Sequence, residues 1–403
     1  MNWPTIPLGQ LADFRNGINY SRKNFGKGIK VIGVSDFQDY SKPHYEDLEE
    51  VNPQGVVSEE DILKDEDILF VRSNGNKDLI GRSLFIDSPT EKVTFSGFCI
   101  RARFFNKAEC PRFYSFIFKS DIVRRTLSAR GGGTNIANLN QKILKTLEVP
   151  YPPLLVRSSV ASILSNYDDL IDNNNRRIAL LEESVHRLYR EWFVHLRFPG
   201  HERVTVRDGV PEGWMEVSLS QITDVISRGV SPKYDESSEK LVINQRCIRD
   251  RLIDLQQSRK HTTRVPEKKE LQFGDILINS TGVGTLGRVA QVRFEPQDIT
   301  VDTHVTIVRP KNSIDKDFFG VALENIDYYF ATLGAGATGQ TELKRQLVGE
   351  TNVLLPPEEL QQQFAITRAL CRKQAQILLE KNDKLREARD RLLPRLMNGT
   401  LTP

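Results

Sequence analysis

Two loops of the sequence gather side chains that recognise nucleic acids. Arginine and lysine bind phosphate or guanine, asparagine pairs with adenine, and hydroxyl groups donate to phosphate oxygens. The first loop contains Arg72, Ser73, Asn74, Asn76, Lys77 and Arg82, and the second contains Asn279, Ser280, Thr281, Thr285 and Arg288. An ordinary solvated turn would account for any one of these residues. Because the same chemistry occurs in two loops, we interpret them as binding surfaces.

Each loop belongs to a repeated motif. "DILFVRSNGNKDLIGRS" begins at Asp67, and "DILINSTGVGTLGRV" begins at Asp275, 208 residues later (275 − 67 = 208). Earlier loops at equivalent places carry further candidates: Arg15, Asn16, Tyr20, Arg22 and Lys23 in the first half, and Arg228, Lys233 and Tyr234 in the second. We expect these side chains to extend the same two surfaces.

The segment "GVGTLG", from Gly282 to Gly287, matches the G-x-G-x-x-G pattern of dinucleotide-binding proteins. That function needs a helix directly after the glycines, because the helix N-terminus holds the pyrophosphate. Here "RVAQVRFEP" follows, which alternates in period two and ends in proline, so it predicts a strand. We interpret the glycines as a hairpin loop. A nucleotide-using enzyme remains an alternative, which a helix after Gly287 would support.

No other motif points to catalysis. "VPYPPLL" contains the letters of an amino-methyltransferase motif in the wrong order and lacks the Asn or Asp that accepts from the target amine. The six histidines show no metal-ligand spacing, and the four cysteines lack C-x-x-C spacing, so neither a zinc site nor a disulfide framework is indicated. We predict no catalytic residue, no metal site and no cofactor on this chain.

Composition is typical of a globular protein. With 403 residues, the chain is long enough for two or three domains, and 39% hydrophobic with 27% charged residues argues against disorder. The net charge of +3 permits a nucleic-acid partner without demanding one. The sequence contains no long apolar run and no signal-peptide pattern, so we expect a cytoplasmic protein without a membrane partner.

The repeated motif is one of three sequence segments that each occur twice, in the same order, along the chain. "WPTIPLGQLADFRNGI" from Trp3 is matched by "WMEVSLSQITDVISRGV" from Trp214, and a "G...T...L" stretch before Pro152-Pro153 is matched by one before Pro356-Pro357. Three matched segments indicate a duplicated unit of roughly 200 residues. Short β-branched and aromatic segments before each Pro-Pro step predict strands, and a helical period follows.

Each helix carries a heptad pattern. Apolar residues recur every seven positions: Leu164, Ile171, Ile178, Val185 and Trp192 in the first helix, and Phe364, Cys371, Leu378, Leu385 and Leu392 in the second. The second row of the later helix, which we place at Thr367, Gln374, Lys381 and Ala388, is more polar. A helix of about 40 residues spans about 60 Å. We therefore predict an α+β fold: two mixed α/β domains in tandem repeat, joined by two long antiparallel coiled-coil helices.

Asn174 occupies a core-type heptad position near the middle of the first helix. A buried asparagine there could fix the register of the helix pair at some cost in stability. A solvated kink or an exposed polar turn is equally compatible with the sequence.

These features together resemble the specificity (S) subunits of type I restriction-modification systems. The resemblance rests on the twofold "GW...LSQI"-like starts, the "DIL...G...GR" segments, the "G...T...L" stretches running into Pro-Pro, and the helix after each. It covers nearly the whole chain. It implies a target-recognition domain at residues 1–152, a spacer helix at 153–197, a linker with a second target-recognition domain at 198–356, and a second spacer helix at 357–403.

The resemblance also implies a function. In that family each domain reads one half of a split, asymmetric site in double-stranded DNA, and the helices set the gap and dock two adenine methyltransferase subunits, which two restriction/translocase subunits join. S-adenosylmethionine, ATP and Mg²⁺ are then expected on partner subunits only. An alternative is the recognition subunit of another multi-subunit or fused methyltransferase/endonuclease system, which only the neighbouring subunits would distinguish.

Overall fold

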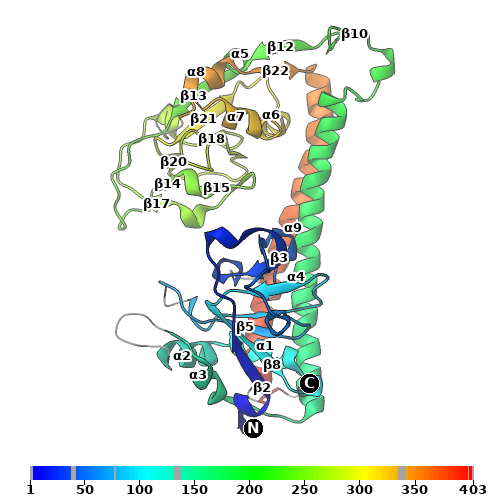
Figure 1. Cartoon of the computed structure of the whole chain (residues 1–403). Helices are drawn as coiled ribbons and strands as arrows, with labels where there is room; N and C mark the ends of the chain where they lie inside the picture. The colour runs from blue at the N-terminus through cyan, green and yellow to red at the C-terminus, as the bar shows by residue number, and fades with distance from the viewer. Residues whose placement is uncertain are drawn as a thin grey trace. The chain divides into compact units, whose positions relative to one another are not determined.

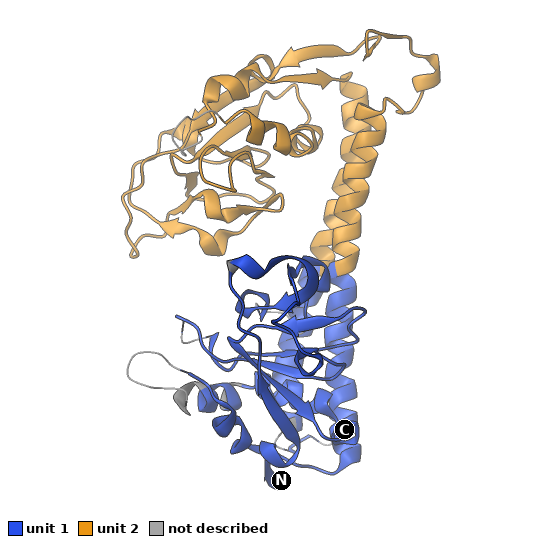
Figure 2. Ribbon diagram, in the orientation of Figure 1, with its two compact units in different colours: residues 1–175, 379–403 blue, residues 176–378 orange. Residues whose placement is uncertain are grey.

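The computed structural model describes residues 3–37, 42–76, 79–130, 138–334, 342–397 and 399–401. They form two compact units (Figure 2): unit 1 comprises residues 1–175 and 379–403, and unit 2 comprises residues 176–378. Each unit contains one mixed domain and a part of both long helices, α4 (Leu154–Tyr189) and α9 (Glu358–Met397) (Figure 1). Over the described ranges, no helix has the length and hydrophobicity that crossing a membrane requires.

Unit 1 is built on an antiparallel four-stranded sheet. Its strands lie in the order β2 (Ala12–Asn16), β8 (Cys99–Phe104), β5 (Ile68–Val71) and β6 (Ser83–Phe85). All four residues of β5 are buried. Ile68 and Phe70 pack in the cluster that includes helix α1 (Pro111–Lys119) and the start of α4, while Leu69 and Val71 pack in a cluster on the other face. The "DIL" motif therefore supplies a strand that is covered on both faces.

A second, three-stranded sheet covers that other face. Its order is β4 (Glu49–Val51), β3 (Phe25–Ile32) and β7 (Val93–Phe95), with β3 and β7 parallel. The remaining elements of unit 1 are β1 (Thr5–Pro7), which pairs with β9 (Glu148–Pro150), and the helices α2 (Asp121–Arg130) and α3 (Gln141–Lys145).

Unit 2 repeats this topology. Its four-stranded sheet has the order β13 (Thr223–Arg228), β21 (Val305–Pro310), β18 (Ile276–Asn279) and β19 (Val289–Gln291). Its three-stranded sheet has the order β17 (Arg259–Lys260), β14 (Leu241–Ile243) and β20 (Ile299–Val301), with β14 and β20 parallel. The duplication predicted from three sequence segments is confirmed at the level of strand order.

Shorter elements complete unit 2. The strand pairs are β10 (Val206–Arg207) with β11 (Val210–Pro211), β12 (Met215–Ser218) with β22 (Asn352–Leu355), and β15 (Ile248–Arg249) with β16 (Leu252–Ile253). The helices are α5 (Leu219–Ile222), α6 (Lys316–Glu324), α7 (Asp327–Thr332) and α8 (Arg345–Glu350). Strand β19 begins at Val289, two residues after Gly287, which contradicts the nucleotide-binding alternative, because that alternative needs a helix there.

The first residue of each "DIL" motif forms the same buried ion pair. Asp67 accepts from Arg103 Nε at 2.8 Å and Nη2 at 2.7 Å, and Asp275 accepts from Arg309 Nε at 2.7 Å and Nη2 at 2.8 Å. Both carboxylates are 1% exposed, so two-point pairing is needed to keep their charge in the core. This structural role explains why an aspartate begins both motifs.

Within unit 1, α4 and α9 run antiparallel. Asp168 pairs with Arg389 (Nη1 to Oδ1, 2.7 Å), and seven positions earlier on α9 Asn382 lies opposite Asn174. Asn174 Nδ2 donates to Asn382 Oδ1 at 2.8 Å, and Asn382 Nδ2 donates to Asn175 Oδ1 at 2.8 Å. Asn174 and Asn382 are 208 residues apart, the same separation as the two "DIL" motifs, so equivalent positions of the repeat pair with each other.

The heptad prediction is largely confirmed, with one correction on α9. Leu164, Ile171, Val185, Phe364 and Leu378 are buried, and the other predicted seam positions are half-buried: Ile178, Trp192, Cys371, Leu385 and Leu392. The second row of α9 was placed one residue too early. The inward-facing row is Arg368, Ala375, Asn382, Arg389 and Leu396, of which Arg389 is half-buried and the others are buried. It is polar because its members pair with carboxylates and amides that are distant in the sequence.

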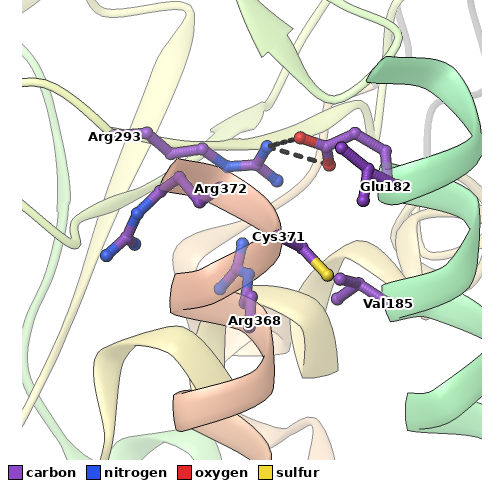
Figure 3. Close-up of a pocket in the computed structure, with 7 residues that line it drawn as sticks. Glu182, Val185, Arg293, Arg368, Cys371 and Arg372 are labelled. Atoms are coloured by element: carbon purple, nitrogen blue, oxygen red, sulfur yellow. Dashed lines mark hydrogen bonds and ion pairs between the residues drawn. The ribbon is translucent and has the colours of Figure 1, made fainter. Parts of the chain in front are cut away.

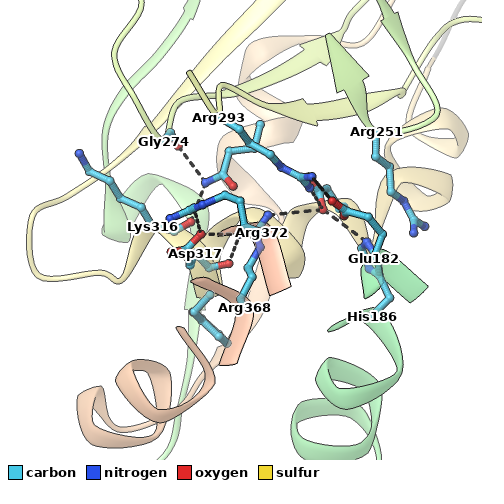
Figure 4. A network of polar contacts seen from close by, with 12 residues as sticks. Glu182, His186, Arg251, Gly274, Arg293, Lys316, Asp317, Arg368 and Arg372 are labelled. Carbon is cyan, nitrogen blue, oxygen red and sulfur yellow. Dashed lines mark hydrogen bonds and ion pairs between the residues drawn. The ribbon is translucent and has the colours of Figure 1, made fainter. Parts of the chain in front are cut away.

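In unit 2, a buried ionic network attaches the mixed domain to both helices (Figure 4). Glu324 at the end of α6 is fully buried and accepts from Arg293 Nη2 at 2.8 and 3.1 Å. Arg293 also reaches Glu182 on α4 across a small pocket (Figure 3). Arg368 on α9 donates to the backbone oxygen of Asp317 and lies 3.9 Å from Glu324. The network joins α4, α6 and α9 through charge pairs.

His186 on α4 lies against this network, with Nε2 3.5 Å from Glu324. Burial, and then the guanidinium groups of Arg251, Arg293, Arg368 and Arg190, lower its pKa to about 3. The unfolded chain binds a proton on this histidine below pH ~6.5, whereas the folded chain stays neutral until about pH 3. Stability is therefore lost as the pH falls. Between pH 7 and pH 5 we expect the difference in unfolding free energy between the wild type and His186→Gln to change by about 2 kcal/mol, in favour of the variant.

Urea unfolding at a series of pH values measures this effect. His195→Gln is a matched control, since His195 is exposed. Parallel pH profiles for the wild type and His186→Gln would show that His186 titrates normally.

Candidate nucleic-acid interface

The first candidate loop of unit 1 leaves β5 and is fixed at its base. Arg72 N donates to Phe98 O at 2.7 Å, and Leu139 N donates to Arg72 O at 2.8 Å. Arg72 Nη1 makes a long hydrogen bond, 3.3 Å, to Gly97 O, and the side chain is half-buried. Ser73 forms a β-bridge with Asn138. The base of the loop is thus ordered by backbone contacts, which leaves the Arg72 guanidinium only lightly held.

Farther along this loop, Asn74 Oδ1 accepts from Asn76 N at 2.8 Å, which is an Asx turn. Asn74 is half-buried and Asn76 is exposed. Arg82, at the end of the loop, is half-buried and engaged by other protein groups. Lys77 lies outside the described residues.

The early loop of unit 1 meets the first loop at the turn Ser96–Phe98, where Gly97 N donates to Ile18 O at 2.6 Å. Asn16 is exposed and accepts a 3.3 Å hydrogen bond from Gln141 Nε2. Tyr20 packs edge to face on Phe25, and burial raises the pKa of its phenol.

Two further candidates of this loop are basic. Lys23 is exposed, and the side chain of Arg22 lies outside the described residues. Arg15 is different, because Asp61 accepts from its Nε at 2.8 Å and Glu60 pairs with its Nη1. The hydrogen bond from Asp61 raises the pKa of Arg15. Its charge is therefore balanced within the protein, which weakens it as a phosphate ligand.

In unit 2, two of the predicted contact residues lie in the interior. Asn279 and Ser280 are fully buried. Asn279 Nδ2 donates to Gln245 O at 2.9 Å, and Ser280 Oγ lies 2.6 Å from Thr306 Oγ1. Direct contact with a ligand needs exposed atoms, so these side chains position the loop instead of forming the predicted surface. A strand residue and the residue after it are buried here because two sheets enclose β18.

The rest of this loop is accessible. Thr281 is half-buried, and its Oγ1 lies 2.8 Å from His304 Nδ1 and 3.2 Å from Gln245 Oε1. Thr285 Oγ1 donates to Thr281 O at 3.3 Å. Arg288 is half-buried and donates from Nη2 to Gly284 O at 3.0 Å, so it holds its own loop. His304 and Gln245 were not predicted, because nothing in their local sequence links them to the "DIL" motif.

The candidate residues of the early loop of unit 2 contact two different parts of the unit. Arg228 donates to Thr303 O and to Glu342 Oε1, each at 2.8 Å, and burial lowers its pKa. Lys233 and Tyr234 instead contact the segment 259–263: Thr262 N donates to Lys233 O at 2.9 Å, and the Arg259 guanidinium lies 3.3 Å from the Tyr234 ring centroid. Both side chains are exposed.

An open groove beside Arg228 contains basic residues that the sequence analysis missed. Its charged lining residues are four cations, Arg228, Lys269, Lys344 and Arg345, and two carboxylates, Glu342 and Glu350. Lys269 Nζ donates to Gly229 O at 2.7 Å, and burial, together with nearby Lys268 and Arg345, lowers its pKa. The "KR" pair at the start of α8 was the available signal. Four cations against two carboxylates suit a polyanion such as a phosphate backbone.

Comparison with known proteins identifies the scaffold. Residues 1–183 match the family model described as "Type I restriction modification DNA specificity domain". The chain is 24% identical over 305 residues to the type I restriction enzyme MjaIX specificity subunit of Methanocaldococcus jannaschii, covering 71% of this chain and 68% of the relative. It is 23% identical over 381 residues to the type I restriction enzyme StySPI specificity subunit of Salmonella potsdam, covering 91% and 81%. Over residues 1–183 the chain matches the type I specificity-domain model, and over most of its length it is similar to type I specificity subunits at 23–24% identity.

The fold agrees with this family. The crystal structure of a type I restriction-modification system S subunit from M. genitalium aligns with a TM-score of 0.53 at 17% identity, covering 98% of this chain and 96% of that one. Both the predicted resemblance and the predicted fold class are confirmed. The family model ends at residue 183, yet unit 2 repeats the strand orders of unit 1, so this chain contains the domain fold twice.

Proposed function

We propose that this chain selects the DNA sequence for a type I restriction-modification complex, reading one half of a bipartite, asymmetric site with each mixed domain. The observation that carries the proposal is that the same strand order occurs in both units, with different side chains in the loops that follow the equivalent strands β5 and β18. The half-buried residues that follow β5 in unit 1 are Arg72 and Ser73, whereas in unit 2 the buried Ser280 and the half-buried Thr281 follow β18. Equivalent loops with different side chains suit two different half-sequences.

The same proposal includes the partners. The chain is a non-catalytic, cytoplasmic scaffold for two adenine methyltransferase subunits and two restriction/translocase subunits, which carry the sites for S-adenosylmethionine, ATP and Mg²⁺. Exposed apolar side chains on the long helices, Leu170 and Leu180 on α4 and Ile366 and Leu370 on α9, support docking of other proteins. The domain boundaries at residues 152, 197 and 356 belong to this proposal.

A long-read methylation map of host DNA, with and without this gene, tests the proposal. We expect N6-methyladenine to disappear at one bipartite motif when the gene is deleted, which also defines both half-sites. If the map does not change, copurification with a methyltransferase separates a silent system from a chain that binds something other than DNA.

Arginine substitutions test which loops touch DNA. We expect Arg72→Ala or Arg288→Ala to weaken binding to one half-site by about 1–3 kcal/mol if the residue reads a base, with discrimination lost at one base pair. If the residue holds a phosphate, binding falls for all sequences and the salt dependence decreases by about one ion. Fluorescence anisotropy with labelled duplexes at several salt concentrations distinguishes these results.

Arg187→Ala is a matched control for the arginine substitutions, since Arg187 is an exposed cation of α4 that pairs with Glu183. Binding unchanged by both loop substitutions would remove these loops from the interface.

A further inference from the structure

A turn after β7 in unit 1 is fastened to both candidate loops. Phe98 O accepts from Arg72 N at 2.7 Å, and Cys99 O accepts from Gly17 N at 3.2 Å. Cys99 N closes the turn by donating to Ser96 O at 2.8 Å. The backbone that presents the Phe98 side chain is therefore rigid and joins the loop after β5 to the loop after β2.

Unit 2 has the same fastening after β20. His304 O accepts from Ser280 N at 2.8 Å, and Val305 O accepts from Gly229 N at 3.2 Å. His304 N also donates to Asp302 Oδ1 at 2.8 Å. Residues 98 and 304 thus occupy the same place in the two copies.

The close fit of loop and turn depends on a glycine in each copy. A Cβ on Gly17 would lie 2.3 Å from Phe95 O, and a Cβ on Gly229 would lie 1.9 Å from Val301 O. Neither position tolerates a side chain, so the early loop rests directly on the backbone before the turn. This contact holds residue 98 or 304 close to both loops.

The side chains at this shared place differ in chemistry. Phe98 is 61% exposed, although a phenylalanine in a rigid turn gains nothing from contact with water. His304 is also exposed, and its Nδ1 lies 2.8 Å from Thr281 Oγ1. An apolar ring next to Arg72 suits contact with a base face or a thymine methyl group, whereas an imidazole with its Nδ1 held by Thr281 can hydrogen-bond a base edge through Nε2.

We propose that residues 98 and 304 are equivalent specificity-determining contacts: Phe98 makes an apolar contact to a base of one half-site, and His304 makes a polar contact to a base of the other. The inference rests on the proposed function and deepens it. It attributes part of the sequence difference between the two half-sites to one structurally equivalent position, which is residue 98 in unit 1 and residue 304 in unit 2. Neither residue belongs to the loop motifs that first indicated binding.

The test uses the full chain and pools of duplexes randomised in one half-site, with bound DNA sequenced before and after selection. We expect Phe98→Ala to relax discrimination at least tenfold at one or two adjacent positions of one half-site and to leave the other half-site unchanged. His304→Ala should do the converse. Phe98→Leu should retain most of the preference, since it keeps an apolar side chain. This variant also serves as a control for correct folding of the turn.

Phe105→Ala is the matched control. Phe105 is 67% exposed and follows the opposite end of the same strand, β8, so it is an equally exposed phenylalanine away from the turn. Unchanged preferences in Phe98→Ala, or a loss of affinity that is equal for all sequences, would overturn the assignment while leaving DNA recognition intact. A wild-type chain that selects no sequence at all would instead overturn the proposed function, and the assignment with it.

Discussion

Replacing Glu324 with glutamine should lower the free energy of unfolding of unit 2 by about 3 kcal/mol. Glu324 is fully buried and balances Arg293 at 2.8 Å, with Arg368 3.9 Å away. Removing one charge from a buried ionic network costs about 3–5 kcal/mol, because the remaining charges stay buried without compensation. We expect the lower end of this range, since Arg293 keeps Glu182 and Arg368 keeps Asp317.

Tryptophan fluorescence can isolate this effect. Trp192 and Trp214 both pack in the core of unit 2, so a Trp3→Phe background reports on that unit alone during urea unfolding. Glu295→Gln is the matched control, because Glu295 is an exposed carboxylate of the same unit. A loss below 1 kcal/mol for Glu324→Gln would mean that the arginines find water or other partners and that the network does not anchor the helices.

Lengthening both helices by one heptad should change the DNA site that the chain accepts. Seven added residues extend a helix by about 10 Å, which corresponds to about three base pairs of DNA. We expect the preferred gap between half-sites to grow by about that amount while both half-sequences stay the same. Affinity for the original gap should fall about a thousandfold, the lower end of the difference between specific and non-specific binding.

The structure indicates where to insert. Unit 1 ends at Asn175 on α4 and resumes at Leu379 on α9, so insertions after Asn175 and after Leu378 fall where the chain passes between units. They do not interrupt the stretch of α4 that carries Asn174, the stretch of α9 that carries Asn382, or the stretch of α4 from which Glu182 contacts Arg293. Whole heptads preserve the phase of the seam.

The control for this experiment inserts seven glycine and serine residues at Gly209, in the turn between β10 and β11, which lengthens the chain without lengthening either helix. Because the half-site sequences are measured at the same time, a folding defect is distinguishable from a changed gap. An unaltered gap in the heptad variant would contradict a ruler role for the helices.

The sequence by itself determined the repeating architecture of this protein. Period-two alternation after Gly287 predicted strand β19, and the heptad of Leu164 and Ile171 predicted the seam of α4, because both patterns report which face of a local element is buried. Asn174 was identified as a candidate for fixing register on the same ground. Hydrophobic periodicity is a local property, so it can be read from the sequence without knowledge of the tertiary contacts.

Only the tertiary structure decided which polar side chains are available to a ligand. Asn279 and Ser280 belong to a recognition-like loop in the sequence, yet sheet packing buries both, and Arg15 is balanced by Asp61, 46 residues away. Asn174 hydrogen-bonds to Asn382, 208 residues later in the chain, and no local sequence pattern predicts this pairing. Burial and charge pairing depend on contacts between distant segments. For this reason the sequence indicated the chemistry of the interface, while the fold determined which residues can perform it.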